Sequence, residues 1–365
     1  MTAKPNGRRW VALVLAVFAL GAFLRLPTFF RSILSDDEAI YATTADALAR
    51  GDLLYRDVVD HKPPLIYHVY QVGFAALGAY NIHGAHALLV LSVLLTGAFL
   101  FAARKVEDPP AGLAGAALFL IFSTTWHDYD ALAANCELFV LAPQAAAACL
   151  LLRDFGKLKA GPAVHFAVGC LIGISMLFKY QGLTFLGVSV GMLVWARFLG
   201  RVSWMRLLAL SACQLAGAIL PAALYLAWCS VAGNAEATLY WFRFNFSYVG
   251  AGLMGTAAIA RGLRRIAMIG GTALVPYGLG LAAAASIAFR LAMRLARLLQ
   301  IRTEPARREG LGRNERRGRI LDVLTSCHRL GFAVACRPRW NMRRELIPST
   351  QNRPLHQSVF DLHAS

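Results

Sequence analysis

Long apolar runs separated by short basic clusters recur through the first 290 residues, and they constrain the fold more than any other feature. Several runs approach the roughly 20 residues that a helix needs to cross the hydrocarbon core of a bilayer. A soluble domain does not combine 58% hydrophobic residues with only 16% charged residues. Because backbone groups inside lipid must be hydrogen-bonded within the protein, we predict an all-α fold, a polytopic bundle of transmembrane helices. The runs occupy residues 10–24, 64–80, 83–103, 110–125, 138–152, 163–178, 182–197, 207–232 and 266–289.

The basic residues set the expected orientation. Lys4, Arg8 and Arg9 precede the first run, so the N-terminus is expected in the cytoplasm and the following loop outside. A cleaved signal peptide would show the same charge pattern, but no small-residue cleavage site precedes Arg25 and further runs follow. The net charge of +17 comes from clusters between apolar runs. This distribution favours cytoplasmic loops and argues against a nucleic-acid partner.

The positions of the basic clusters limit the number of crossings. If all of them are cytoplasmic, only one net crossing separates the first external loop from residue 104, although two apolar runs occupy that interval. We therefore expect the run 64–80, which contains His68 and Gln71, to be interfacial or re-entrant. The alternative is two ordinary crossings that leave residues 104–105 outside. The clusters lie at 104–105, 153–159, 197–206 and from 290 onward.

The chain is expected to contain four segments: a first span (1–30), a periplasmic catalytic loop (31–63), a helical bundle (64–290) and a basic cytoplasmic tail (291–365). From residue 302 the composition changes, because the last 64 residues hold 13 arginines, no lysine and no run long enough to span a membrane. Two interpretations remain: a disordered tail, or a frame-shifted and truncated end, which we favour slightly. The expected topology places three later segments outside with the catalytic loop: 128–137, 179–181 and 234–257.

The loop after the first span begins with a helix-start pattern. Ser35 and Glu38 have the spacing of a capping box, in which the serine hydroxyl accepts from the Glu38 amide and the glutamate accepts from the Ser35 amide. We predict a helix over residues 36–50 that is stopped by Gly51.

Three consecutive acids occupy the first turn of that helix. If Glu38 turns back to cap, then Asp37 points elsewhere and shares a face with Tyr41. Asp37 is then the carboxylate that is free to act. The plainer alternative is that all three acids, with Asp36, only complement the helix dipole.

Two motifs carry the most specific pattern in the chain. They read Asp37-Glu38-Ala39-Ile40-Tyr41 and, after Tyr55-Arg56-Asp57, His61-Lys62-Pro63-Pro64-Leu65. Together they resemble the first extracytoplasmic loop of the GT-C glycosyltransferases, and within them the bacterial branch related to protein O-mannosyltransferases and to the aminoarabinose transferase of lipid A. Weaker matches occur at 135–137 and 179–181, so the resemblance covers roughly residues 10 to 290.

The resemblance implies an integral glycosyltransferase of the bacterial inner membrane. Such an enzyme takes a sugar from a polyprenyl-phosphate carrier and transfers it, on the periplasmic face, to an envelope acceptor that is a lipid or a glycan. The implied partners are this donor, the acceptor and membrane lipids. The resemblance leaves room for a divalent cation, Mg²⁺ or Mn²⁺. No nucleotide cofactor is expected, because the sequence has no phosphate-binding glycine loop.

The resemblance and the chemistry together suggest roles for the charged residues. Transfer with inversion needs a carboxylate that takes the acceptor's proton and positive charge that stabilises the departing phosphate. Asp37, with Glu38 beside it, suits the first task. Lys62, Lys179 and Arg243 are the candidates for contact with the lipid phosphate.

The resemblance also implies a second acidic site, which in the related enzymes helps to bind a metal ion or the acceptor. The expected ligands are Asp37, His61 and Glu137. Asp128 and Asp130 compete with Glu137, which we prefer because it directly precedes an apolar run.

Each of these assignments has a plainer alternative. Lys62 could be an interfacial residue that snorkels, and His61 could be a hydrogen-bonded loop residue. Arg25, just inside the outer end of the first span, is expected to snorkel. Lys179 could lie in a surface turn, and Arg243 could belong to an aromatic belt at the membrane surface.

Two other classes of protein compete with the enzyme. A transporter or lipid flippase would place charges in the middle of its spans and often show repeated halves. Here the charges flank the runs and no repeat is evident, which favours the enzyme. A catalytically inactive, truncated relative that only binds lipid is the third alternative.

Overall fold

The computed structural model describes residues 7–104, 108–125, 129–155 and 161–253, together with residues 260 and 264. All of the described residues belong to one compact unit of the chain. Within this part of the chain the named elements are helices, and one isolated bridge joins Leu54 to Val58. The prediction of an all-α fold is confirmed. The predicted run 266–289 and the predicted tail 291–365 lie outside the described residues.

The helices follow one another with short connections. Three short 3₁₀ helices, η1 (Leu26–Phe29), η2 (Tyr129–Ala131) and η3 (Tyr180–Leu183), accompany them. The α-helices are α1 (Gly7–Leu24), α2 (Asp36–Ala49), α3 (Leu65–Leu77), α4 (His83–Arg104), α5 (Pro109–Phe122), α6 (Cys136–Phe155), α7 (Pro162–Phe178), α8 (Thr184–Phe198), α9 (Trp204–Ala232) and α10 (Ala235–Leu253).

Several helices have the dimensions of membrane spans. Among the described residues, five helical stretches are long and apolar enough to cross a bilayer. Helix α3 has 13 residues, so it extends only about 20 Å, whereas the hydrocarbon core is about 30 Å thick. Helices α5 and α7 are also short, at 14 and 17 residues, so length does not single out α3. The interfacial or re-entrant placement of 64–80 stays a prediction. The five stretches are Gly7–Phe29, His83–Ala103, Cys136–Asp154, Tyr180–Phe198 and Trp204–Ala232.

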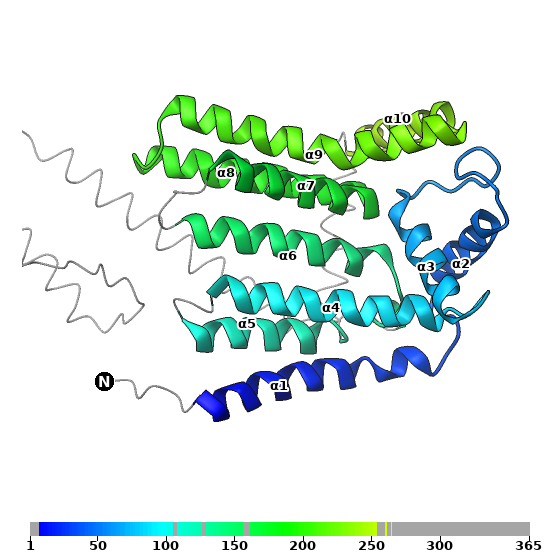
Figure 1. Cartoon of the computed structure of the whole chain (residues 1–365), viewed down its shortest axis with the longest axis horizontal. Helices are drawn as coiled ribbons and strands as arrows, with labels where there is room; N and C mark the ends of the chain where they lie inside the picture. Colours follow the sequence, from blue (N-terminus) through cyan, green and yellow to red (C-terminus); the bar gives the residue numbers. More distant parts are fainter. Residues whose placement is uncertain are drawn as a thin grey trace, which may run out of the picture. The chain divides into compact units, whose positions relative to one another are not determined.

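The long helices lie side by side, and α2 and α3 lie together beyond one end of them (Figure 1). We call this end the site end. It gathers α2, α3, the first turns of α4 and α6, and the last turn of α7, because contacts link all of these segments. The opposite end carries arginines at the start of α1, the end of α8 and the start of α9, and we call it the basic end.

Glycines bring α7 and α9 into backbone contact. A β-carbon added at Gly169 would collide with the carbonyl oxygen of Gln214, and one added at Gly217 would collide with that of Phe166. Close approach through small residues is a common way for helices to pack in membranes, where lipid removes the hydrophobic drive between them. The crossing holds α7 firmly, and with it the side chains at its C-terminal end.

Candidate functional site

Helix α2 starts as the sequence predicts. The Ser35 hydroxyl accepts a hydrogen bond from the Glu38 amide at 3.4 Å, and the helix ends at Ala49, before Gly51 with φ of +100°. The prediction for the second half of the capping box, a hydrogen bond between the Glu38 carboxylate and the Ser35 amide, is wrong. Oε2 of Glu38 accepts from the amide of Leu34 at 2.6 Å rather than from that of Ser35. The glutamate therefore secures the residue before the cap.

Glu38 is the buried member of the acidic triplet. Its side chain has no exposed surface, and its Oε1 lies 2.9 Å from Nε2 of His86, which is equally buried. The same oxygen accepts a hydrogen bond from the amide of Ala134. Glu38 thus ties α2 to α4 and to the segment that precedes α6. These contacts stabilise the packing of three segments, and the catalytic role predicted for Glu38 stays a prediction.

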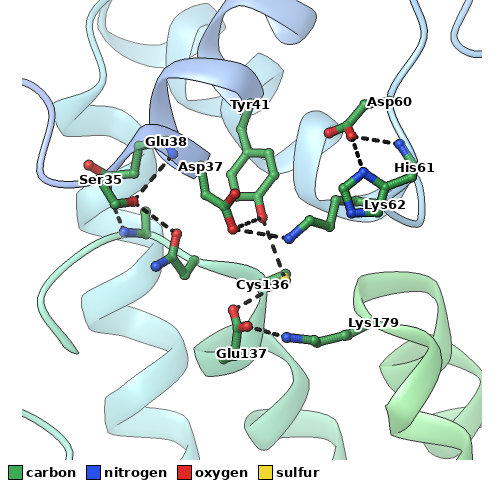
Figure 2. A network of polar contacts seen from close by, with 12 residues as sticks. Ser35, Asp37, Glu38, Tyr41, Asp60, His61, Lys62, Cys136, Glu137 and Lys179 are labelled. Atoms are coloured by element: carbon green, nitrogen blue, oxygen red, sulfur yellow. Dashed lines mark hydrogen bonds and ion pairs between the residues drawn. The ribbon is translucent and has the colours of Figure 1, made fainter. Parts of the chain in front are cut away.

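Asp37 is the partly exposed member, and it pairs with Lys62. The Lys62 Nζ donates to Asp37 Oδ2 at 3.0 Å, and the Tyr41 hydroxyl lies 3.2 Å from the same oxygen (Figure 2). The Asp37 side chain is 38% exposed and the Lys62 side chain 17%. Among the described residues, no hydrogen bond reaches the other Asp37 oxygen, Oδ1. The predicted separation of roles between Asp37 and Glu38 therefore matches the geometry.

Lys62 is held at its backbone by a loop that spans residues 51–64. The Tyr55 hydroxyl donates to the Lys62 carbonyl at 2.6 Å, from a residue that is buried and has φ of +69°. Asn234, just before α10, donates to the carbonyl of Leu54 at 2.9 Å and fixes this loop against the end of α9. Lys62 is consequently presented to Asp37 by a fixed main chain.

The charge on Lys62 is stabilised by its surroundings. Burial opposes the charged form, but the hydrogen bond with Asp37 and the negative charges of Asp37 and Glu137 outweigh it. The net effect raises the pKa of Lys62 above its ordinary value of 10.5. Lys62 is a cation at every physiological pH.

A second carboxylate–lysine pair lies next to the first. Glu137, in the first turn of α6, pairs with Lys179 at the end of α7. The thiol of Cys136 donates to Oε2 of Glu137 at 3.3 Å, and its sulfur lies 3.7 Å from the Tyr41 hydroxyl. Tyr41 and Cys136 therefore link the two pairs into one network, as Figure 2 shows. Exposure is 40% for the Glu137 side chain and 26% for that of Lys179.

The predicted metal ligands have other polar partners in the described structure. His61 is 63% exposed, and its Nδ1 lies 2.9 Å from Oδ1 of Asp60, whose other oxygen accepts from the Tyr67 hydroxyl. Asp37 and Glu137 are each paired with a lysine. The part of the chain that the structure describes contains no group of three or more His, Cys, Asp or Glu residues arranged to hold a metal ion. Binding of a divalent cation by Asp37, His61 and Glu137 stays a prediction.

The remaining candidates lie away from the network. Arg243 is on the exposed side of α10, near the aromatic residues Tyr240 and Phe244, and no contact joins it to the two lysines in the described structure. Asp130 is exposed in η2, and Asp128 lies outside the described residues. Contact between Arg243 and the lipid phosphate stays a prediction.

Arg25 contradicts its prediction. It was expected to snorkel toward the membrane surface, but it is 1% exposed. Its guanidinium donates to the carbonyls of Ala131 and Ser123 and to the Ser123 hydroxyl. These bonds hold the segment that leads to Cys136. Arg25 therefore stabilises the position of this segment without contacting the network itself in the described structure. The partners are about 100 residues away in sequence, where no local pattern could reveal them.

No protein-family model matches this sequence, and no curated protein matches it. The resemblance to GT-C enzymes therefore depends on the two motifs and on the weaker matches at 135–137 and 179–181. The geometry of the residues in those motifs is the independent observation on which a function can be proposed.

Proposed function

We propose that this chain is an integral membrane glycosyltransferase that moves a sugar from a polyprenyl-phosphate carrier to a lipid or glycan acceptor of the cell envelope. One observation carries the proposal. A partly exposed carboxylate, Asp37, lies against Lys62 and next to the pair formed by Glu137 and Lys179, all at one end of an apolar bundle. Such charges are costly beside lipid and are usually functional.

The network contains the groups that the reaction requires. An acceptor hydroxyl oxygen attacks the anomeric carbon of the donor sugar, and its proton passes to Asp37 as general base. The bond between that carbon and the phosphate oxygen breaks, and its electron pair stays on the phosphate. The donor phosphodiester carries one negative charge, whereas the released monoester carries about 1.5 to 2 at neutral pH. Lys62 and Lys179 provide the positive charge that stabilises this increase.

The proposed orientation follows from the two ends of the bundle. Arg8 and Arg9 lie at the start of α1, and Arg197, Arg201 and Arg206 lie where α8 meets α9. By the positive-inside rule the basic end faces the cytoplasm, and the site end then faces the periplasm. This orientation supports our proposal of a bacterial inner-membrane protein, with its N-terminus inside and its site on the side where envelope glycans are completed.

The location of the charges also favours the enzyme over the alternative functions. A transporter or flippase needs polar groups along a path through the bundle. The four charged side chains of the network lie instead at helix ends and in a loop. An inactive lipid-binding relative would keep the lysines but would not depend on Asp37.

Mass spectrometry of the envelope tests the function. Glycolipids and glycans are compared between the parent strain, a deletion strain, and deletion strains that express the wild type or Asp37→Asn at equal levels. We expect one sugar modification to disappear on deletion, to return with the wild type and to stay absent with Asp37→Asn. An envelope that is unchanged by the deletion would contradict the proposal, and full restoration by Asp37→Asn would favour a carrier-binding protein without this chemistry.

A further inference from the structure

Both lysines of the network are already paired with carboxylates. Lys62 holds Asp37 at 3.0 Å, and Lys179 holds Glu137. If these lysines bind the donor phosphate, as the proposed function requires, the phosphate must compete with the two carboxylates. The structure therefore raises the question of which partner leaves.

The exposed fractions of the four side chains indicate that the carboxylates leave and the lysines stay. In each pair the carboxylate is more exposed than the lysine: 38% against 17% for Asp37 and Lys62, and 40% against 26% for Glu137 and Lys179. A carboxylate that already contacts water loses less when it is released into water than a half-buried ammonium would. Lys62 is also fixed at its carbonyl by Tyr55. The lysines are the stationary partners and the carboxylates are the ones that can move.

We propose that an anionic prenyl phosphate displaces Asp37 from Lys62 and Glu137 from Lys179, so that donor binding itself frees the catalytic carboxylate. This inference rests on the proposed function and adds to it an order of events, with the donor first and the acceptor second. Before the exchange, Oδ2 of Asp37 is occupied by Lys62 and Tyr41. After it, the ammonium of Lys62 contacts the phosphate, and Asp37 can accept the proton of an acceptor hydroxyl.

The link between the pairs lets them respond together. The Tyr41 hydroxyl has one proton and lies near both Oδ2 of Asp37 and the sulfur of Cys136, which in turn donates to Glu137. When Asp37 leaves Lys62, the Tyr41 proton can stay with this carboxylate and keep one hydrogen bond on it. The exchange thus replaces each lost contact without leaving a buried polar group unpaired.

A binding measurement without any transfer tests the exchange. A short-chain prenyl phosphate, with no sugar attached, is titrated against the purified full chain in nanodiscs of neutral lipid. Removing a competing carboxylate should tighten binding, so we expect Asp37→Asn and Glu137→Gln each to bind roughly 3- to 10-fold more tightly, as breaking a partly exposed ion pair allows. Asp36→Asn is the matched control, because Asp36 is an exposed acid in the same helical turn. It should bind within about 2-fold of wild type, since screening weakens the effect of an exposed charge.

Several outcomes would overturn the proposal. Unchanged or weaker binding by Asp37→Asn would show that the carboxylate does not compete. Equal tightening by Asp36→Asn would show general repulsion instead of exchange. Retention of the gain in the double variant Asp37→Asn, Lys62→Met would show that Lys62 is not the shared partner. Inorganic phosphate that competes as well as the prenyl phosphate would show a site for a free anion instead of a lipid.

The result of the prenyl phosphate titration does not depend on catalysis. If the affinities change as expected but no sugar transfer is found, the exchange at the two lysines stands and the glycosyltransferase proposal fails. If transfer is found but the affinities do not change, only the exchange fails. Thermal unfolding of each variant, measured beforehand, confirms that the variants compared are folded.

Discussion

The two ends of the bundle hold polar groups of different kinds. At the site end, two carboxylates and two lysines are paired, and their side chains are between 17% and 40% exposed. Nearer the basic end, Gln214 of α9 lies 2.9 Å from Nδ1 of His165 on α7 and accepts from the Ser189 hydroxyl on α8 at 2.8 Å. These three residues are at most 1% exposed. The first group is charged and partly exposed, whereas the second is buried. Beyond the second group, Nε2 of His165 faces Oδ2 of Asp154 at 3.8 Å.

This difference separates function from packing. A polar cluster that is buried and mutually hydrogen-bonded can hold helices together but has no room for a ligand. A charged cluster at the surface of a membrane protein is expensive to keep and can exchange its partners. We therefore expect substitutions at the site end to change binding or catalysis, and substitutions in the Gln214 cluster to change stability alone.

The largest expected effect concerns the membrane topology, because labelling of a cysteine from outside is all or none. In a variant without native cysteines, Asp57→Cys and Gln181→Cys should react from outside with a membrane-impermeant thiol reagent, whereas Arg201→Cys should react only after the membrane is opened. All three positions are exposed or partly exposed in the structure, so accessibility in the protein itself does not limit labelling. Labelling of position 201 but not 57 in intact cells would invert the two ends and remove the periplasmic site.

The next largest effect concerns Lys62. Lys62→Ala should weaken binding of the prenyl phosphate by roughly 10- to 100-fold, the loss expected for a charge-assisted hydrogen bond. Lys62→Arg should keep part of the affinity, since the charge survives but its compact geometry does not. Arg56→Ala is the control, because Arg56 is exposed in the same loop and pairs with Asp57. If Lys62→Ala binds like the wild type, Lys62 is only an interfacial anchor.

The pH dependence of the same measurement follows from the raised pKa of Lys62. A raised pKa means that the ion pair is present below the ordinary value of 10.5 and is lost only as the pH rises through the higher value in the folded protein. Lys62 should therefore cause no change in prenyl phosphate affinity between pH 6 and about 10. A loss of affinity near pH 8 that disappears in Lys62→Arg would contradict this assignment.

Glu38 should behave differently from its neighbour. Glu38→Gln removes the charge that accepts from Ala134 and faces His86, so the protein should lose about 1–3 kcal/mol of stability. Transfer per folded molecule should change little. Glu236→Gln, an exposed glutamate in the first turn of α10, should leave the melting temperature unchanged. A variant Glu38→Gln that melts normally but transfers no sugar would make Glu38 a catalytic residue after all.

The smallest effect is expected in the buried cluster. Gln214→Leu leaves Nδ1 of His165 without its partner, while the Ser189 hydroxyl keeps its bond to the carbonyl of Leu186. Interhelical bonds of this kind contribute about 0.6 kcal/mol on average in membranes, so the melting temperature should fall slightly. Prenyl phosphate affinity and sugar transfer should remain those of the wild type. A loss of either at an unchanged melting temperature would erase the distinction between the two clusters.

Local patterns in the sequence predicted the parts of this architecture that depend on neighbouring residues. The serine cap of α2, its end before Gly51 and the short helix after Pro64 follow from spacing and from residue preferences. The charge clusters also indicated which segments would share an end of the bundle. These local patterns could not predict which residues far apart in the sequence would contact each other.

Glu38 and Arg25 illustrate why those partners were missed. The contacts of Glu38 with His86 and Ala134 span 48 and 96 residues, and they alone decide that this acid is buried while Asp37 is not. The helical period told us that the two acids diverge, but not which neighbours each would meet. Arg25 looks like an interfacial residue until its carbonyl partners on a distant segment are known. Burial of a polar group is decided by tertiary contacts that the local sequence does not contain.

The rate of the chemical step is the most direct test of the central claim, that Asp37 at the site end is the base for sugar transfer. Single-turnover transfer is measured with the polyprenyl-phosphate sugar bound to wild type, Asp36→Asn and Asp37→Asn at equal amounts of folded protein. We predict that Asp37→Asn falls by roughly 10²- to 10⁴-fold, the usual loss of general-base catalysis, while Asp36→Asn stays within about 2-fold of wild type. Full activity of Asp37→Asn with an inactive Asp36→Asn would contradict the account.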